Sequence, residues 1–408
     1  MTTPLIKFAA AWVVIVTCLL AACSPIVSSA STIQEAEITA IPIPTSTAAA
    51  KPEKIVSVGT PARTEIEDHS TAEAVEKNIP SARGGYVVFS QESGEFIAYR
   101  PDGAAAYTIP AAGIKYPSSF NTSVVDGAVY YLPDNSEKFV RAAPNEIKVL
   151  DIPTNSMSRI DVSADEKYIA WSLFNTNGSS ALWAARMDEN QNILEQREVA
   201  HYSFEQSNAF NLTPIDWTDD SQLLFERGLT GIGGYILYGG YNSLYRYNPE
   251  DGTLTTLIPA EENHGLCLEN YRPDLAKVLF NCSRDGREII IRDLNSYSDQ
   301  KIPTLPGQGA AGSAHLSPSG RRLAYAVARN NPDNESGEVV VVTTDLSTAP
   351  AAIAKVTDNS YPVVLGWLNE DTLLFASSRW PEAAIWSIRY DGSQLEKVTD
   401  GWFIGWIR

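Results

Sequence analysis

Two of the four cysteines in this 408-residue chain are spaced so that they could form a disulfide. Cys267 and Cys282 flank a predicted turn between Asp274 and Leu275, and both lie equally far from its centre. Because an antiparallel pair of strands places such residues opposite each other, we expect the two thiols to face one another. An exported location would permit oxidation, so a disulfide is favoured over the alternative of two buried thiols.

The N-terminal residues carry a second kind of cysteine chemistry. Lys7 precedes a short apolar run over 8–20, and the run ends in Leu20-Ala21-Ala22-Cys23. This resembles the bacterial lipobox, in which the cysteine thiol receives a diacylglyceryl group and the chain is cleaved just before it. We therefore expect a signal peptide over 1–22 and a lipid on Cys23, which places the protein on the extracytoplasmic face of a bacterial cell membrane. The alternative is an ordinary secretory signal with an incidental cysteine, and the choice between inner and outer membrane is left open.

The other residue types that could do chemistry do not form a recognisable site. The four histidines lack the pairwise spacing of metal ligands; they are His69, His201, His264 and His315. The run 307–312 fits G-x-G-x-x-G, but no helix is expected after it to hold a pyrophosphate, so we interpret it as a linker. The sequence has no G-x-S-x-G, H-E-x-x-H, C-x-x-C or P-loop motif. We therefore expect no cofactor and no bound metal.

The acidity of the chain disfavours two classes of partner. Its net charge is −18 and its pI is about 4.7. Nucleic-acid phosphates need clustered Lys and Arg, and anionic lipid headgroups need a basic face. The acidity is best explained as a contribution to solubility.

Composition divides the chain at Gly84. Residues 23–83 are rich in Ser, Thr, Ala, Pro and Glu and poor in aromatics, so they cannot bury enough apolar surface to offset the entropy of ordering. We expect a lipidated Cys23 followed by a disordered tether. From 84 to 408, short aromatic and β-branched runs alternate with Gly, Pro, Asp and Asn, which is typical of strands and tight turns.

The strand pattern repeats seven times. One aromatic residue closes a strand in each unit, at intervals of 40 to 55 residues: Phe89, Tyr131, Trp171, Phe225, Phe280, Tyr325 and Phe375. That spacing is typical of four-stranded propeller blades. The sequence therefore predicts an all-β, seven-bladed β-propeller of four-stranded antiparallel blades, with units over 84–110, 118–153, 157–200, 210–259, 264–304, 311–357 and 361–400.

The turns resemble those of a known repeat. Ser317-Pro318-Ser319-Gly320, followed by Leu323-Ala324-Tyr325, and the later Tyr390-Asp391-Gly392-Ser393 are similar to the WD40-like repeats of TolB-type propellers and of prolyl-oligopeptidase-family propeller domains. The resemblance implies the fold and not a function. TolB carries an N-terminal α/β domain, which residues 24–83 are not expected to supply. The peptidases carry a hydrolase domain, which we do not expect here.

The first unit lacks an inner strand, because it begins directly with a second-strand pattern at Gly84. The last residues repeat the inner-strand pattern, since Ile404-Gly405-Trp406 matches Leu365-Gly366-Trp367. We therefore expect Ile404–Ile407 to pair with Tyr86–Phe89 and so to close the ring.

The connections differ between the two faces of the predicted ring. Tight turns share one face, and the long segments share the other, because antiparallel strands alternate in direction. Candidate ligand-binding residues on the loop-bearing face are Tyr235, Tyr238, Tyr241, Trp380 and His201. We expect a monomeric binding or scaffold protein that recognises a cell-envelope protein or glycan. The alternatives are a propeller enzyme, either a hydrolase or a lyase on glycan or peptide, and a sensor subunit.

Overall fold

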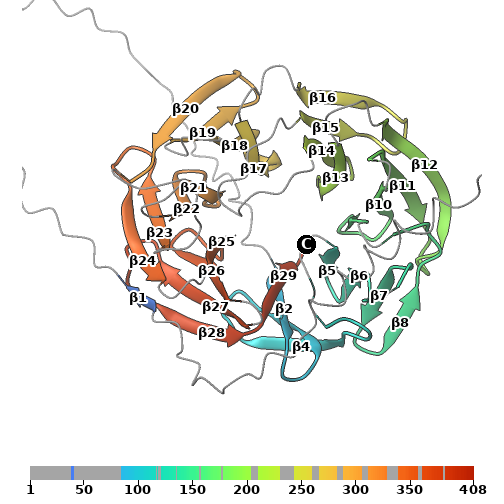
Figure 1. Ribbon diagram of the computed structural model, residues 1–408, viewed down its shortest axis with the longest axis horizontal. Coiled ribbons are helices and arrows are strands. Elements are labelled where there is room, and N and C mark those ends of the chain that lie inside the picture. Colours follow the sequence, from blue (N-terminus) through green and yellow to red (C-terminus); the bar gives the residue numbers. More distant parts are fainter. Residues whose placement is uncertain are drawn as a thin grey trace, which may run out of the picture. The chain divides into compact units, whose positions relative to one another are not determined.

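The computed structural model describes residues 38–40, 84–115, 117, 121–134, 136–155, 158–175, 178–203, 210–229, 243–259, 266–282, 288–305, 311–328, 339–356, 361–379 and 382–408. Within these ranges the elements are strands, apart from one short 3-10 helix, η2 (Pro273–Leu275). They form seven antiparallel sheets placed as blades around a central axis (Figure 1). The chain is therefore a seven-bladed β-propeller, as the repeat spacing predicts.

Each blade is a sheet whose four repeat strands follow one another outward from the axis. The first blade consists of β29 (Trp402–Trp406), β2 (Tyr86–Ser90), β3 (Glu95–Tyr99) and β4 (Ala105–Pro110). The second consists of β5 (Thr122–Val125), β6 (Ala128–Tyr131), β7 (Val140–Ala143) and β8 (Glu146–Val149). The third consists of β9 (Ile160–Val162), β10 (Tyr168–Phe174), β11 (Ser180–Met187) and β12 (Ile193–Tyr202).

The remaining four blades continue in the same order around the ring. The fourth consists of β13 (Phe210–Trp217), β14 (Leu223–Leu229), β15 (Ser243–Tyr247) and β16 (Leu254–Ile258). The fifth consists of β17 (Leu266–Arg272), β18 (Lys277–Cys282), β19 (Glu288–Asp293) and β20 (Ser298–Pro303). The sixth consists of β21 (Ala311–Leu316), β22 (Arg322–Ala328), β23 (Val339–Asp345) and β24 (Ala351–Val356). The seventh consists of β25 (Tyr361–Trp367), β26 (Thr372–Arg379), β27 (Glu382–Arg389) and β28 (Glu396–Asp400).

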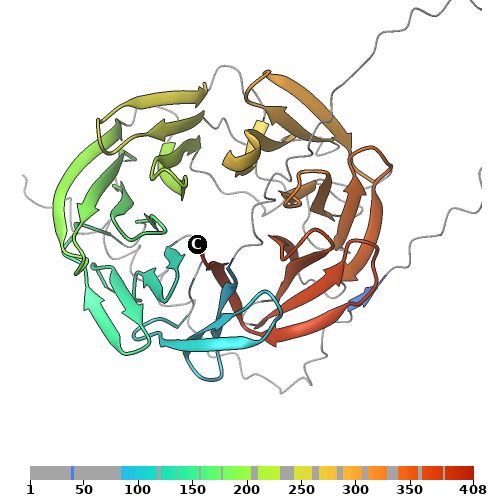
Figure 2. The ribbon, with the colours of Figure 1, turned by 180° about the vertical axis from the view of Figure 1, so that it is seen from behind.

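The last strand closes the first blade, as expected. β29 pairs antiparallel with β2, with Trp406 opposite Tyr86 and Trp402 opposite Phe89. The Ile407 N–H adds a hydrogen bond of 2.9 Å to the Gly85 carbonyl. The strand begins two residues earlier than the predicted Ile404, and a bulge between Val87 and Val88 takes up the irregular register. Closure leaves no gap between the seventh blade and the first (Figure 2).

The aromatic residues that mark the repeat form the core of the ring. All seven are buried, none more than 3% exposed: Phe89, Tyr131, Trp171, Phe225, Phe280, Tyr325 and Phe375. They lie on the second strand of each blade and contribute to clusters that pack one blade against the next. A cluster between the seventh and first blades, with Tyr86, Val88 and Leu374, completes the series. A blade has two apolar faces, so only stacked neighbours can bury both.

The expected direct opposition of Cys267 and Cys282 is wrong by one residue. Cys267 lies opposite Asn281, and Cys282 lies opposite Leu266. Between the turn and Asn270, the pairing of β17 with β18 has the register that would place the two cysteines opposite each other. Beyond Asn270 a bulge at Glu269 shifts this register by one position. No disulfide is seen in the part of the chain that the structure describes, so the disulfide stays a prediction.

The sixth blade has a fifth strand that the composition of the tether did not predict. β1 (Ile38–Ala40) pairs antiparallel with the outer strand β24, with Thr39 opposite Lys355. It lies at the rim of the ring, and both ribbon views place it beside β24 (Figures 1 and 2). The predicted tether therefore contains at least one ordered contact with the propeller.

Candidate functional site

The two faces of the ring differ in how their connections are built. Turns from first to second strands and from third to fourth strands lie on one face, here called the turn face. They are short and closed by backbone hydrogen bonds, such as Ser163 N–H to Tyr168 O and Ser317 N–H to Arg322 O, both 2.9 Å. The other connections leave from the opposite face, here called the loop face. The longest of them join β14 to β15, over 230–242, and β4 to β5, over 111–121.

On the turn face, the Ser-Pro-Ser-Gly turn over 317–320 connects the sixth blade to the seventh through hydrogen bonds. The Glu370 carboxylate accepts hydrogen bonds from the Ser317 hydroxyl (2.9 Å), the Ser319 hydroxyl (2.6 Å) and the Ser319 N–H (3.0 Å). Burial alone would raise the pKa of Glu370, but these donors hold it below its usual range. Gly320 has φ +71°, and a Cβ there would lie 2.7 Å from Leu275 Cδ1 of the fifth blade. The clearest sequence motif is therefore structural.

Other polar groups on the turn face also join neighbouring blades. Arg272 of the fifth blade donates to three consecutive carbonyls of the sixth, at 3.1, 2.9 and 3.1 Å; these belong to Leu316, Ser317 and Pro318. Glu166 of the third blade accepts from Tyr130 (2.6 Å) and Arg141 (2.8 Å) of the second. These donors and acceptors already have partners within the ring, which leaves them little capacity to bind a ligand.

The central channel holds a charge cluster that crosses the ring. Arg408, which follows β29, lies near the axis where Figure 1 marks the chain end. Its Nη1 contacts both carboxylate oxygens of Asp161 on β9, at 2.7 and 2.8 Å, and its Nη2 lies 3.3 Å from Asp216 Oδ1 on β13. The Ser123 hydroxyl of β5 donates to Asp161 at 2.9 Å. The Arg408 guanidinium therefore joins the first blade to the inner strands of the third and fourth blades. Through Ser123, the inner strand of the second blade also contacts Asp161.

Burial governs the electrostatics of this cluster. The Asp161 side chain is only 5% exposed, and burial raises the pKa of Asp161 to about 6, although Arg408 and Ser123 oppose the shift. The two carboxylates raise the pKa of Arg408 against the opposing effect of its burial, so the guanidinium stays protonated. Two carboxyl groups therefore share one guanidinium.

A second polar group of the channel lies on the fifth and sixth blades. Glu269, the bulge residue of β17, accepts the Ala314 N–H at 3.3 Å. Burial raises the pKa of Glu269 to about 7, although backbone donors from Ala314 and Ser313 lower it. Next to it, the Asn270 amide lies 2.9 Å from His315 Nδ1.

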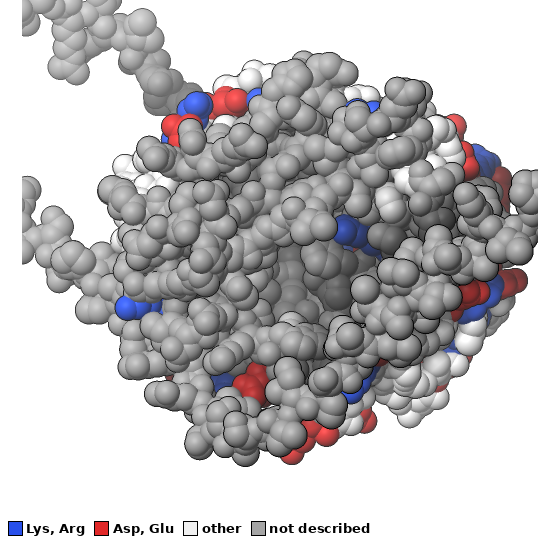
Figure 3. Space-filling model, viewed as in Figure 1, with Lys and Arg blue, Asp and Glu red and all other residues white. Residues whose placement is uncertain are grey.

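The loop face is hollowed near the axis, and Lys or Arg side chains line part of the hollow (Figure 3).

The described residues contain no group of three or more His, Cys, Asp or Glu that could hold a metal ion. None of the helices in the described ranges is long and apolar enough to span a membrane.

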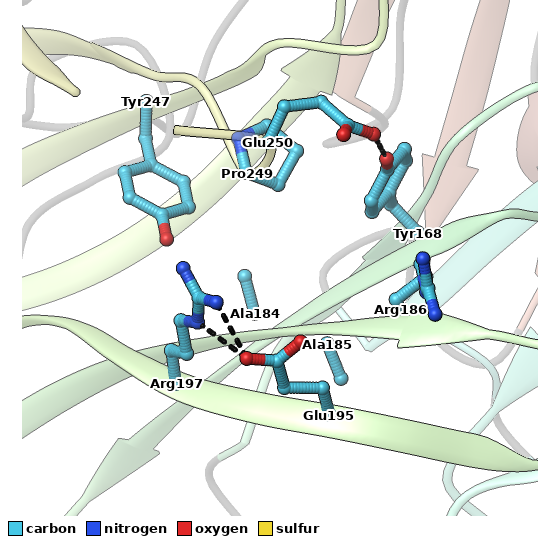
Figure 4. Close-up of a pocket in the computed structure, with 9 residues that line it drawn as sticks. All are labelled: Tyr168, Ala184, Ala185, Arg186, Glu195, Arg197, Tyr247, Pro249 and Glu250. Carbon is cyan, nitrogen blue, oxygen red and sulfur yellow. Dashed lines mark hydrogen bonds and ion pairs between the residues drawn. The ribbon is translucent and has the colours of Figure 1, made fainter. Parts of the chain in front are cut away.

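A small pocket between the third and fourth blades is lined by polar groups that contact one another (Figure 4). It encloses about 130 Å³. Arg197 donates to Glu195 at 3.0 Å, and the Tyr168 hydroxyl bonds to Glu250. The pocket is smaller than the several hundred Å³ that a drug-sized ligand needs, and Arg197, Glu195 and Glu250 already have partners within it.

Of the residues that the sequence singled out for ligand binding, one falls within the described ranges. His201 lies near the loop-face end of β12, with a side chain that is 46% exposed, 3.2 Å from Ser203 Oγ and 4.0 Å from Glu198. Four candidates lie outside the described residues: Tyr235, Tyr238, Tyr241 and Trp380. Cys23, the expected lipidation site, lies outside them too.

The sequence reasoning missed the channel cluster. A usable signal was present, since Asp161 stands between Ile160 and Val162 and Asp216 between Ile215 and Trp217. A charged residue inside an otherwise apolar inner strand needs a partner. Nothing in the local pattern of the last strand pointed to Arg408 as that partner.

Comparison with solved structures finds matches that cover most of the chain. A TolB protein from Acinetobacter baumannii matches with 14% identity and a TM-score of 0.40, over 76% of this chain and 77% of that one. A putative TolB from Agrobacterium tumefaciens matches with 15% identity and a TM-score of 0.37, over 79% and 91%. The chain is similar to TolB proteins. A prolyl endopeptidase also matches, with 12% identity and a TM-score of 0.43, over 74% of this chain and 44% of that one.

No family model and no curated protein matches the chain. At these identities and TM-scores the structural likenesses carry no argument about what the chain binds, so the function has to be argued from its own residues.

Proposed function

We propose that the chain is a lipid-anchored, extracytoplasmic binding or scaffold protein that recognises a protein or other cell-envelope component through the loop face of its propeller. The observation that carries the proposal is the asymmetry of the ring. Several polar groups of the turn face are committed to contacts between blades, as in Glu370 with Ser317 and Ser319. The longest connections between strands leave from the other face. Loops held by a rigid scaffold are the usual place for recognition.

The alternative, a propeller hydrolase or lyase, is less well supported. Such an enzyme would need two carboxylates free to act as acid and base at the channel. Asp161 and Asp216, which lie near each other there, instead share Arg408. Shared pairing of this kind commits both carboxylates to one guanidinium and joins inner strands of the ring.

The N-terminal part of the proposal is anchoring. The Leu20-Ala21-Ala22-Cys23 motif supports a lipid on Cys23, which would hold the propeller at the membrane. A Cys23→Ser variant should be released into the soluble fraction, whereas the wild-type chain should partition with membranes.

Binding through the loop face is tested by shortening one connection. Replacing 230–242 with an Asn-Gly turn should abolish capture of the envelope partner, while the melting temperature changes by only a few degrees, because loop length affects stability weakly. A length-preserving control carries Tyr235→Ser, Tyr238→Ser and Tyr241→Ser, and it should also lose capture if the tyrosines make the contact. Full capture by both variants, measured by pull-down with the full chain, would rule out this segment.

A further inference from the structure

The outer edges of the blades differ in how they resist pairing with another strand. An exposed edge strand presents unpaired N–H and C=O groups, and charged side chains usually protect it. Four outer strands carry two or three Asp, Glu, Lys or Arg residues each: β8, β12, β20 and β28. β24 has the sequence Ala-Ala-Ile-Ala-Lys-Val, with the single charge of Lys355 and no proline. Its edge is therefore open to strand addition.

β24 also has a partner. Ile38, Thr39 and Ala40 pair with Val356, Lys355 and Ala354 in a regular antiparallel register. The outer strands of the first and fourth blades, β4 and β16, carry no Asp, Glu, Lys or Arg, but no described segment pairs with the outer edge of either. A scarcity of charged residues on an edge strand is thus insufficient to explain why β1 lies on the sixth blade.

We propose that the outer edge of β24 is a strand-addition site whose occupant is the chain's own segment Ile38–Ala40. Backbone hydrogen bonds provide the recognition, as in other cases where a peptide extends a sheet. The segment lies far from the start of the first blade in sequence, so docking divides the tether into two parts. The site therefore sets how far the propeller can move from the N-terminal anchor.

The change in reach is large. This step rests on the proposed lipid at Cys23. An undocked tether over 24–83 could extend to about 200 Å, since each extended residue spans about 3.4 Å. With β1 docked, only 24–37 separate the anchor from the ring, which limits the reach to about 50 Å. Docking therefore keeps the propeller within about 50 Å of the anchor, and release would let it sample a wider zone.

Hydrogen exchange on the full chain tests the docking directly. Thr39→Pro removes a backbone donor and fixes φ in the middle of β1, so amides of 354–356, which lie opposite β1, should exchange roughly tenfold faster than in the wild type. Thr47→Pro makes the same substitution outside β1 and should leave exchange at 354–356 unchanged. Amides of β16 should be unaffected in both variants. Equal exchange at 354–356 in wild type and Thr39→Pro would overturn the proposal.

Two further readouts separate the other outcomes. If protection of 354–356 grows with protein concentration, the occupant is the segment of a second copy, and docking within one chain is wrong. Exchange measured on Cys23→Ser separates the docking of β1 on β24 from the lipid anchor on Cys23. Wild-type protection in that variant supports docking whether or not Cys23 carries a lipid, and loss of membrane partitioning alone bears only on the anchor.

Discussion

Replacing Arg408 with alanine is expected to lower the free energy of unfolding by about 3 kcal/mol, because it leaves the buried Asp161 carboxylate without its counter-ion. The guanidinium makes contacts of 2.7 and 2.8 Å with that carboxylate and 3.3 Å with Asp216. Ser123 alone cannot compensate a buried negative charge. Chemical denaturation of the full chain at pH 8 measures the loss.

The loss should shrink as the pH falls. The folded-state pKa of Asp161 is raised to about 6 from an ordinary 3.8, so protonation of this group favours the folded protein, and its contribution diminishes as the pH rises through 6. Removing Arg408 raises that pKa further. At pH 5 Asp161 is then largely neutral with or without Arg408, so the substitution costs less than at pH 8.

Arg100→Ala provides the control for this experiment. Arg100 pairs with Asp102 at 3.6 Å, but both side chains are more than half exposed, so the cost should be under about 1 kcal/mol and nearly independent of pH. Equal losses for the two variants, or a loss at Arg408 that is the same at pH 5 and pH 8, would contradict the role assigned to the channel cluster.

Gly401→Ala is expected to cost about 3 kcal/mol, because it forces apart the two segments that close the ring. Gly401 joins β28 to β29 with φ +133°, and a Cβ there would lie 2.4 Å from the Phe89 carbonyl oxygen and 2.8 Å from Val88 Cγ1. A carbonyl oxygen of β2 cannot move aside without breaking the pairing of β2 with β29. The melting temperature and the denaturant midpoint both report the loss.

Gly103→Ala is the matched control for the closure. Gly103 also has a positive φ, +81°, but a Cβ added there would have no atom within 4 Å, so only the backbone preference is lost. That preference is worth about 1 kcal/mol. If the two substitutions destabilise the protein equally, close contact at the closure is not what Gly401 provides.

The blades and their closure were predictable because each signal lies within a short stretch of sequence. Each unit contains a polar turn that is followed within a few residues by an alternating strand ending in an aromatic residue, and this pattern recurs along the chain. The missing inner strand of the first blade was equally visible, and the closing residues matched it. Such patterns determine which strands exist and in which order they stack.

The contacts that were missed depend on geometry that the pattern does not carry. Arg408 meets Asp161 across 247 positions of sequence, and that meeting depends on the width of the channel. The bulge at Glu269 shifts Cys267 by one position relative to β18, and no residue type near it predicts a bulge. β1 has only three residues, too few for a period to be detected.

The central claim is that partners are recognised on the loop face, and site-specific photo-cross-linking tests it most directly. A photoreactive residue is placed at Asn175 or His201 on the loop face, and at Arg321 or Asp391 on the turn face, all of them exposed in the full chain. We predict that an envelope partner cross-links from Asn175 or His201 and not from Arg321 or Asp391. Cross-links from the turn-face positions, with none from the loop face, would contradict the account.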